Sequence, residues 1–62
     1  MHFAVETERE TDGRWIAEIT DIPGALAYGE TEDAARANVY ALALRVIADQ
    51  VEEFQFRPGV AN

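Results

Sequence analysis

The chain has 62 residues, a formal net charge of −7 and no cysteine. This length allows one small domain, and the lack of cysteine excludes disulfides and thiolate metal sites. The acidity argues against direct binding to nucleic acid, because phosphate neutralisation supplies most of the affinity of nucleic-acid-binding proteins. The charge either keeps the protein soluble or complements a basic partner.

No apolar run approaches the roughly 20 residues that span a bilayer, and the first residues lack the basic and apolar regions of a secretory signal. We therefore expect a cytoplasmic protein that is not bound to a membrane. The single histidine, His2, stands at the start of the chain, so neither a metal nor another cofactor is expected. A domain this small buries only about 60% of its unfolded surface, which favours association with other chains.

Three short strands are predicted in the first half of the chain. Apolar and polar residues alternate over residues 3–8, 15–19 and 25–29, which is the pattern of half-buried strands. Asp12-Gly13 and Pro23-Gly24 lie between these runs and favour tight turns. The three segments therefore predict an antiparallel meander.

A long helix is predicted next, with Thr31 as its N-cap and its end at about residues 49–52. One apolar stripe at helical spacing is expected to face the sheet: Ala35, Val39, Leu42, Ala43 and Val46. A second stripe lies about 100° around the helix: Tyr40, Leu44, Ile47 and Val51. It either widens the core against a further strand or forms an oligomer interface, and we predict the interface because one small sheet covers a single stripe.

A fourth strand is predicted over residues 53–57, where apolar and polar residues alternate again before Pro58-Gly59. The expected order is β-β-β-α-β. The fold class is thus α+β: a three-stranded antiparallel meander, a right-handed crossover helix and a fourth strand. All elements belong to a single domain that covers residues 1–62.

Residues 12–24, with the sequence DGRWIAEITDIPG, resemble the hallmark segment of HicB-like proteins. The resemblance extends over residues 3–57 and includes a small-residue strand and the start of the helix. Thr20 stands where the family commonly has proline, a change that keeps the following turn. The matching residues at the helix start are Gly29, Thr31, Ala35 and Asn38.

This resemblance implies an antitoxin of a type II toxin–antitoxin pair with a partial ribonuclease H-like fold. HicB proteins bind a small basic RNA-cleaving toxin, HicA, and obstruct its catalytic histidine, and they form dimers or tetramers. Typical members add a DNA-binding domain. This sequence ends soon after the predicted fourth strand, so operator binding is not expected of the chain by itself.

The predicted partner-binding residues combine aromatic side chains, which supply binding energy, with carboxylates, which attract a basic protein. They are Trp15, Glu18, Asp21 and Tyr28. For Trp15 a place in the core is the alternative to partner contact. For Asp21 the alternative is capping of the adjacent turn.

Two other functions stay open. The chain could be a standalone HicB-like oligomeric regulatory or structural domain with no toxin partner. It could also be a weak metal-dependent nuclease that uses Glu6, Glu18 and Asp21. We expect a binding protein with no catalytic residue, because scattered carboxylates are common in so acidic a chain.

Overall fold

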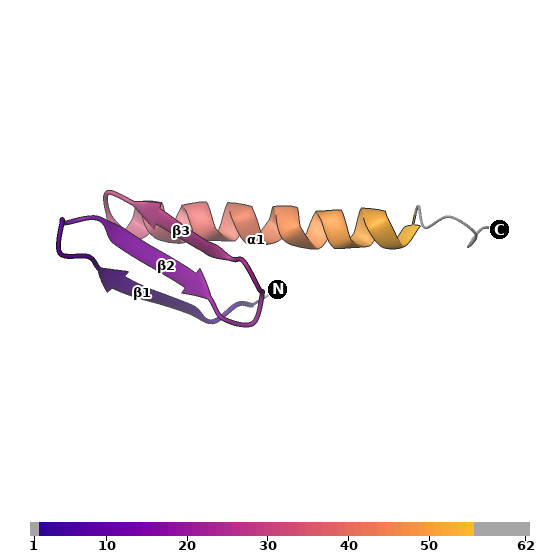
Figure 1. Cartoon of the computed structure of the whole chain (residues 1–62), viewed down its shortest axis with the longest axis horizontal. Coiled ribbons are helices and arrows are strands. Elements are labelled where there is room, and N and C mark those ends of the chain that lie inside the picture. Colours follow the sequence, from indigo (N-terminus) through magenta and orange to yellow (C-terminus); the bar gives the residue numbers. More distant parts are fainter. Residues whose placement is uncertain (1, 56–62) are drawn as a thin grey trace.

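The computed structural model describes residues 2–55, which form three strands and one helix. Strands β1 (Val5–Arg9), β2 (Trp15–Ile19) and β3 (Leu26–Gly29) pair antiparallel in the order β1-β2-β3. Helix α1 (Glu32–Gln55) crosses one face of this sheet (Figure 1). The α+β class, the antiparallel meander and the helix that follows it are therefore confirmed.

The turn between β2 and β3 closes around Pro23 and Gly24. The Ala25 N–H donates to the Ile22 carbonyl at 3.0 Å, and Gly24 has a φ of 85°. Proline at the second turn position and a left-handed residue at the third are the signature of a type II turn. The turn predicted from the Pro-Gly pair is thus confirmed.

Small residues dominate the core between the sheet and α1. The buried set comes from β2, the residue before β3 and the helix: Ala17, Ile19, Ala25, Ala35, Val39 and Ala43. Trp15 and Ile22 are partly buried and pack around this cluster. Alanine on both the sheet and the helix lets their backbones approach closely. Ile19 and Val39 are the largest fully buried side chains.

Two side-chain hydrogen bonds, made by Thr31 and Asn38, stabilise the junction between β3 and α1. The Ala34 N–H donates to the Thr31 hydroxyl oxygen at 3.0 Å, which confirms the predicted N-cap. The amide of Asn38 donates to the Tyr28 carbonyl at 2.8 Å. These bonds tie the first turns of the helix to the last strand of the sheet.

The C-terminal half of α1 extends beyond the sheet (Figure 1). A helix of 24 residues is about 36 Å long, whereas a five-residue strand spans about 17 Å. Residues 53–55 belong to this helix, so the fourth strand predicted from residue 53 is wrong for them. The rest of that predicted strand, residues 56–57, lies outside the described residues.

The predicted strand failed because a five-residue alternation also fits a helix. Val51 and Phe54 stand three residues apart, at helical spacing, and no glycine or proline separates them from the preceding helix. Glutamate and glutamine, which fill the remaining positions, are good helix formers. Continuing the helix by one turn therefore costs less than starting a new strand.

Candidate functional site

The face of the sheet opposite α1 carries three carboxylates beside three apolar side chains. Alternation along the strands sends these six residues away from the helix, and the strand register arranges them in two rows of three. We call this surface the open face. Its members, row by row, are Glu6, Glu18 and Leu26, then Glu8, Ile16 and Tyr28.

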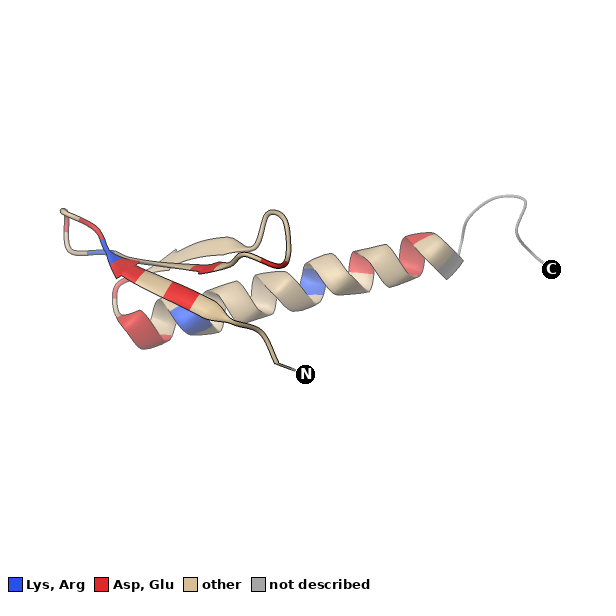
Figure 2. Cartoon of the chain, turned by 90° about the horizontal axis from the view of Figure 1, so that it is seen from below, with Lys and Arg blue, Asp and Glu red and all other residues tan. Residues whose placement is uncertain are grey.

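A shallow hollow of about 130 Å³ opens on this face between β1 and β2. Small-molecule sites are usually about 300–1,000 Å³, so the hollow suits one side chain of a partner better than a cofactor. Its lining is mostly acidic: Glu6, Thr7, Glu8, Ile16 and Glu18. Figure 2 shows further acidic residues at both ends of the helix, which add to the net negative charge of the chain.

Glu6 and Glu18 stand directly opposite each other on neighbouring strands. Like charges in such a cross-strand pair oppose folding by a few tenths of a kcal/mol to about 1 kcal/mol. A lysine or arginine side chain between them would remove the repulsion and form charge-assisted hydrogen bonds. The pair therefore favours a cationic partner.

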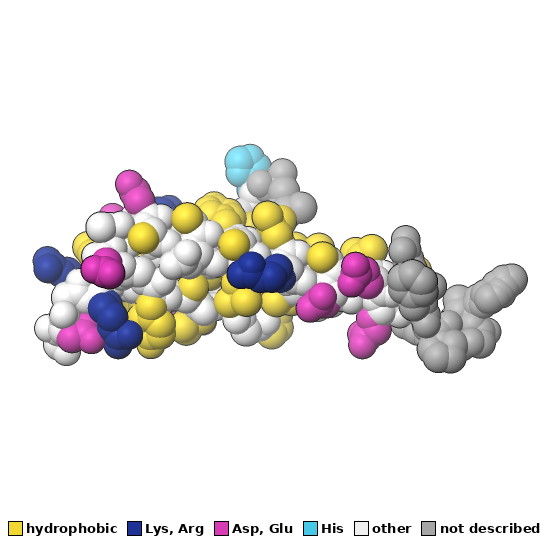
Figure 3. Space-filling view, turned by 90° about the horizontal axis from the view of Figure 1, so that it is seen from above, with side chains coloured by type: hydrophobic (Ala, Val, Ile, Leu, Met, Phe, Trp, Pro, Cys, Tyr) yellow, Lys and Arg dark blue, Asp and Glu magenta, His cyan; other side chains and the backbone are white. Residues whose placement is uncertain are grey.

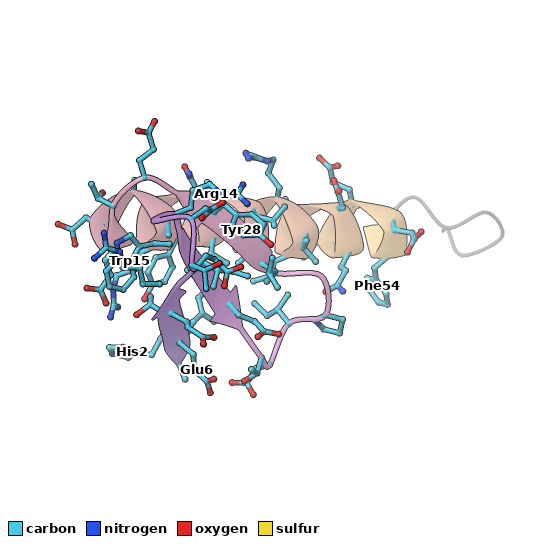
Figure 4. All side chains as sticks on the ribbon, turned by 60° about the vertical axis from the view of Figure 1, so that its left-hand side comes forward. His2, Glu6, Arg14, Trp15, Tyr28 and Phe54 are labelled. Carbon is cyan, nitrogen blue, oxygen red and sulfur yellow. The ribbon has the colours of Figure 1, made fainter. Side chains whose placement is uncertain are left out.

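Arg14 and Tyr28 form the edge of the open face (Figure 4). The Arg14 guanidinium carbon lies 4.7 Å from the Tyr28 ring centroid, a cation–π contact. The Arg14 Nε–H also donates to Asp12 Oδ2 at 2.9 Å. Tyr28 remains 42% exposed, so one part of its ring is available to a partner while Arg14 orients the rest.

The pKa of Asp12 is expected to lie below its ordinary value of 3.8. The chief cause is the Arg14 backbone N–H, which donates to Oδ1 at 3.0 Å; partial desolvation opposes it, and the Arg14 guanidinium adds to the lowering. Because the folded-state pKa is depressed, ionised Asp12 stabilises the hairpin above pH 3.8, and this support is lost as the pH falls through the lowered pKa.

NMR titration of the side-chain carboxyl groups measures this pKa. In an Arg14→Gln variant most of the lowering should persist, because the backbone N–H that chiefly causes it remains. A return of the Asp12 pKa to its ordinary value in that variant would show that the guanidinium is the main cause instead.

The three carboxylates of the nuclease alternative are not brought together. Glu6 and Glu18 face each other on the sheet, whereas Asp21 lies in the exposed turn after β2. Over residues 2–55, no three histidine, aspartate or glutamate side chains are placed to hold a metal ion. The paired carboxylate oxygens that two-metal chemistry requires are thus not assembled in this part of the chain.

The four predicted partner-binding residues divide between surfaces. Glu18 and Tyr28 lie on the open face, and Asp21 is exposed in the turn at its end. Trp15 points to the helix side, where it is partly buried against the core (Figure 4), so it does not share the surface of Glu18 and Tyr28. Its core placement, the alternative considered above, describes it better.

Sequence reasoning missed two apolar members of the open face, Ile16 and Leu26, and the carboxylate of Glu8. The signal was present in the alternation, which places Ile16 on the face of Glu18 and Leu26 on the face of Tyr28. Glu8 follows Glu6 by two residues and shares its face for the same reason. The alternation did not predict the pairing register, which places these residues of the three strands side by side.

No helix within residues 2–55 has both the length and the apolar character needed to cross a bilayer. Compared with known proteins, the sequence matches no family model, no curated protein and no solved structure. The fold and the site define a small α+β protein. A helix covers one face of its sheet, and the other face is open and carries both carboxylates and apolar side chains.

The residues that carry the HicB-like resemblance build the scaffold of this protein. Gly13 and Gly24 have positive φ in the two turns, and Ala17 and Ala35 are fully buried. Thr31 caps the helix. Four of the six residues of the open face lie between these positions, so the resemblance rests on residues that have structural roles in this chain.

Proposed function

We propose that this chain is a HicB-type antitoxin module that binds a small basic HicA-type toxin and covers its RNA-cleaving site. The resemblance of residues 12–24 and of the helix start supports the family. The observation that carries the proposal is the open face, where Glu6, Glu8 and Glu18 surround a hollow beside exposed apolar side chains. The partial ribonuclease H-like fold and a cytoplasmic location, where toxin and RNA meet, belong to the same proposal.

Binding would proceed from charge to apolar contact. The net charge of −7 steers a basic protein toward the domain, and a lysine or arginine side chain enters the hollow between Glu6 and Glu18. Burial of Leu26 and Tyr28, which are 41% and 42% exposed, then holds the complex. Inhibition follows because RNA phosphates cannot reach basic residues that the antitoxin already covers; no bond is broken by the antitoxin itself.

A charge reversal on the open face tests this proposal. The chain is co-purified with the small basic protein encoded beside its gene, and association rates are measured at several salt concentrations. Glu18→Lys should lower the association rate at low salt by about tenfold or more and restore RNA cleavage by the toxin. Glu52→Lys, an equal charge change near the far end of the helix, should have an effect within about twofold.

Two results would count against the proposal. One is an association rate that does not change with ionic strength or responds equally to both substitutions, since the open face would then not steer the encounter. The other is a gene without a small basic reading frame beside it, which would remove the proposed toxin and leave the standalone domain.

A further inference from the structure

We infer that α1 pairs antiparallel with α1 of a second copy of this chain. The contact surface is the second apolar stripe of the helix, called here the outer stripe: Tyr40, Leu44, Ile47 and Val51. Tyr40, Leu44 and Val51 are 38%, 51% and 51% exposed, although they are large apolar side chains. This inference does not depend on the partner proposed for the open face.

The outer stripe is not an extension of the intramolecular core. Beyond Val46 the sheet-facing side of the helix becomes polar, with Asp49, Gln50 and Glu53 at the positions that continue it. The outer stripe stays apolar over the same turns, where the sheet no longer lies beneath the helix (Figure 1). In Figure 3 hydrophobic side chains run along the upper margin of the helix, and charged side chains occupy the centre of the view. Within residues 2–55 no other element covers this part of the stripe, and an exposed apolar surface of this kind marks a site of contact with another molecule.

The spacing of the outer stripe identifies that cover as another helix. Its members follow one another at intervals of four, three and four residues, the a and d positions of a coiled coil. Exposed alanines lie beside it and permit close approach of two helices: Ala37, Ala41 and Ala48. Arg45 and Asp49, the two charged residues between positions 37 and 51, lie on the far side of the helix.

A second copy satisfies the stripe because the stripe is complementary to itself. With a two-fold axis between Leu44 and Ile47, Tyr40 meets Val51 of the second copy and Leu44 meets Ile47 of the second copy, so every layer is apolar. The Phe3 ring lies 6.1 Å from the Tyr40 ring, centroid to centroid, and extends the outermost layer. Each of the four members thus has a partner of suitable size within the same sequence.

Charge selects the antiparallel orientation. The C-terminal part of the described helix carries Asp49, Glu52 and Glu53, and its last turn contains no basic residue. A parallel pair would bring these acidic ends together, with repulsion between the charges and between the aligned helix dipoles. The antiparallel pair separates them by most of the length of the seam.

Sedimentation equilibrium of the full chain measures the assembly without any toxin. We expect twice the chain mass of 6.9 kDa, and a dissociation constant raised about a hundredfold by Leu44→Glu, which buries two like charges near the two-fold axis. Leu26→Glu is the matched control: Leu26 is a similarly exposed leucine on the open face, at 41%, and its replacement should leave the dimer intact.

Cross-linking tests the orientation and does not depend on the stability of Leu44→Glu. The chain has no cysteine, so single cysteines can be introduced at Ala41 and Ala48, which the proposed register places side by side across the seam. A short bismaleimide should join Ala41→Cys to Ala48→Cys much faster than it joins Ala41→Cys to itself.

The outcomes separate this inference from the proposed function. Three results would each overturn the helix pair. The chain could remain a monomer at a concentration on the order of 100 μM, or the dimer could be broken by Leu26→Glu but not by Leu44→Glu. The third is equal rates for the two cross-linking reactions. None of these results bears on whether Glu18→Lys weakens toxin binding. Conversely, loss of toxin binding by a stable dimer would contradict only the proposed function.

Discussion

Replacement of Gly29 by alanine should lower the free energy of unfolding by a substantial share of its total. A Cβ atom at this position would lie 2.4 Å from the Ala35 backbone nitrogen and 2.8 Å from the Ala34 carbonyl carbon. These are backbone atoms in the first turn of α1, so no side-chain rotation removes the clash. Forcing apart such packed elements costs about 1–3 kcal/mol or more, against about 3–9 kcal/mol of total stability for a chain of this length.

Urea unfolding followed by circular dichroism measures this loss as a lower midpoint. Gly13→Ala is the control, because a Cβ atom there meets nothing within 4 Å. The only cost expected is the strain of holding alanine at a φ of 93°. This substitution should cost about 1–2 kcal/mol from the left-handed backbone alone. If Gly29→Ala proved no more destabilising than Gly13→Ala, the close approach of helix and strand at Gly29 would be refuted.

Truncation of Ile19 to alanine should lower the free energy of unfolding by about 2–5 kcal/mol, a large share of the about 3–9 kcal/mol expected for a chain of this length. Ile19 is 0% exposed and shares with Val39 the place of largest fully buried side chain. The other members of the buried cluster are alanines, whose short side chains cannot move in to fill the space left behind. Apart from Val39, the larger neighbours that could move toward the space are the partly buried side chains around the cluster, such as Trp15 and Ile22.

Ile16→Ala makes the same chemical change on the same strand but on the open face. Ile16 is only partly buried and has no helix packed on it, so the expected loss in free energy of unfolding is below about 1 kcal/mol. Equal losses for the two variants would mean that the sheet buries both faces. The two isoleucines thus report directly on which face is the core.

Local chemistry explains why the first half of the fold was predictable. Asp12-Gly13 and Pro23-Gly24 determine the turns by their own backbone preferences, and β2 was placed with its observed bounds between them. Thr31 marked the start of the helix because a capping hydroxyl acts within one turn. Each of these signals operates over a few residues, so it can be recognised without knowledge of the rest of the chain.

Long-range contacts decide the structure at two places. Trp15 was predicted to bind a partner, with the core as the alternative, and the packing of α1 against its side of the sheet partly buries it. The alternation after residue 53 indicated a strand, but the helix continues through Gln55. In both places the local pattern fits two states, and the choice depends on what lies next to the segment in space.

The sequence by itself determined the order of the three strands and the helix, the Pro23-Gly24 turn and the two apolar stripes of the helix, because these follow from backbone preference and periodicity. Only the tertiary structure decided which sheet face α1 covers, and therefore that Glu6, Glu18 and Tyr28 share an open surface. It also decided that the helix extends beyond the sheet and leaves Tyr40, Leu44 and Val51 of the outer stripe exposed. Register and relative length depend on contacts between segments distant in the chain, and no local pattern encodes them.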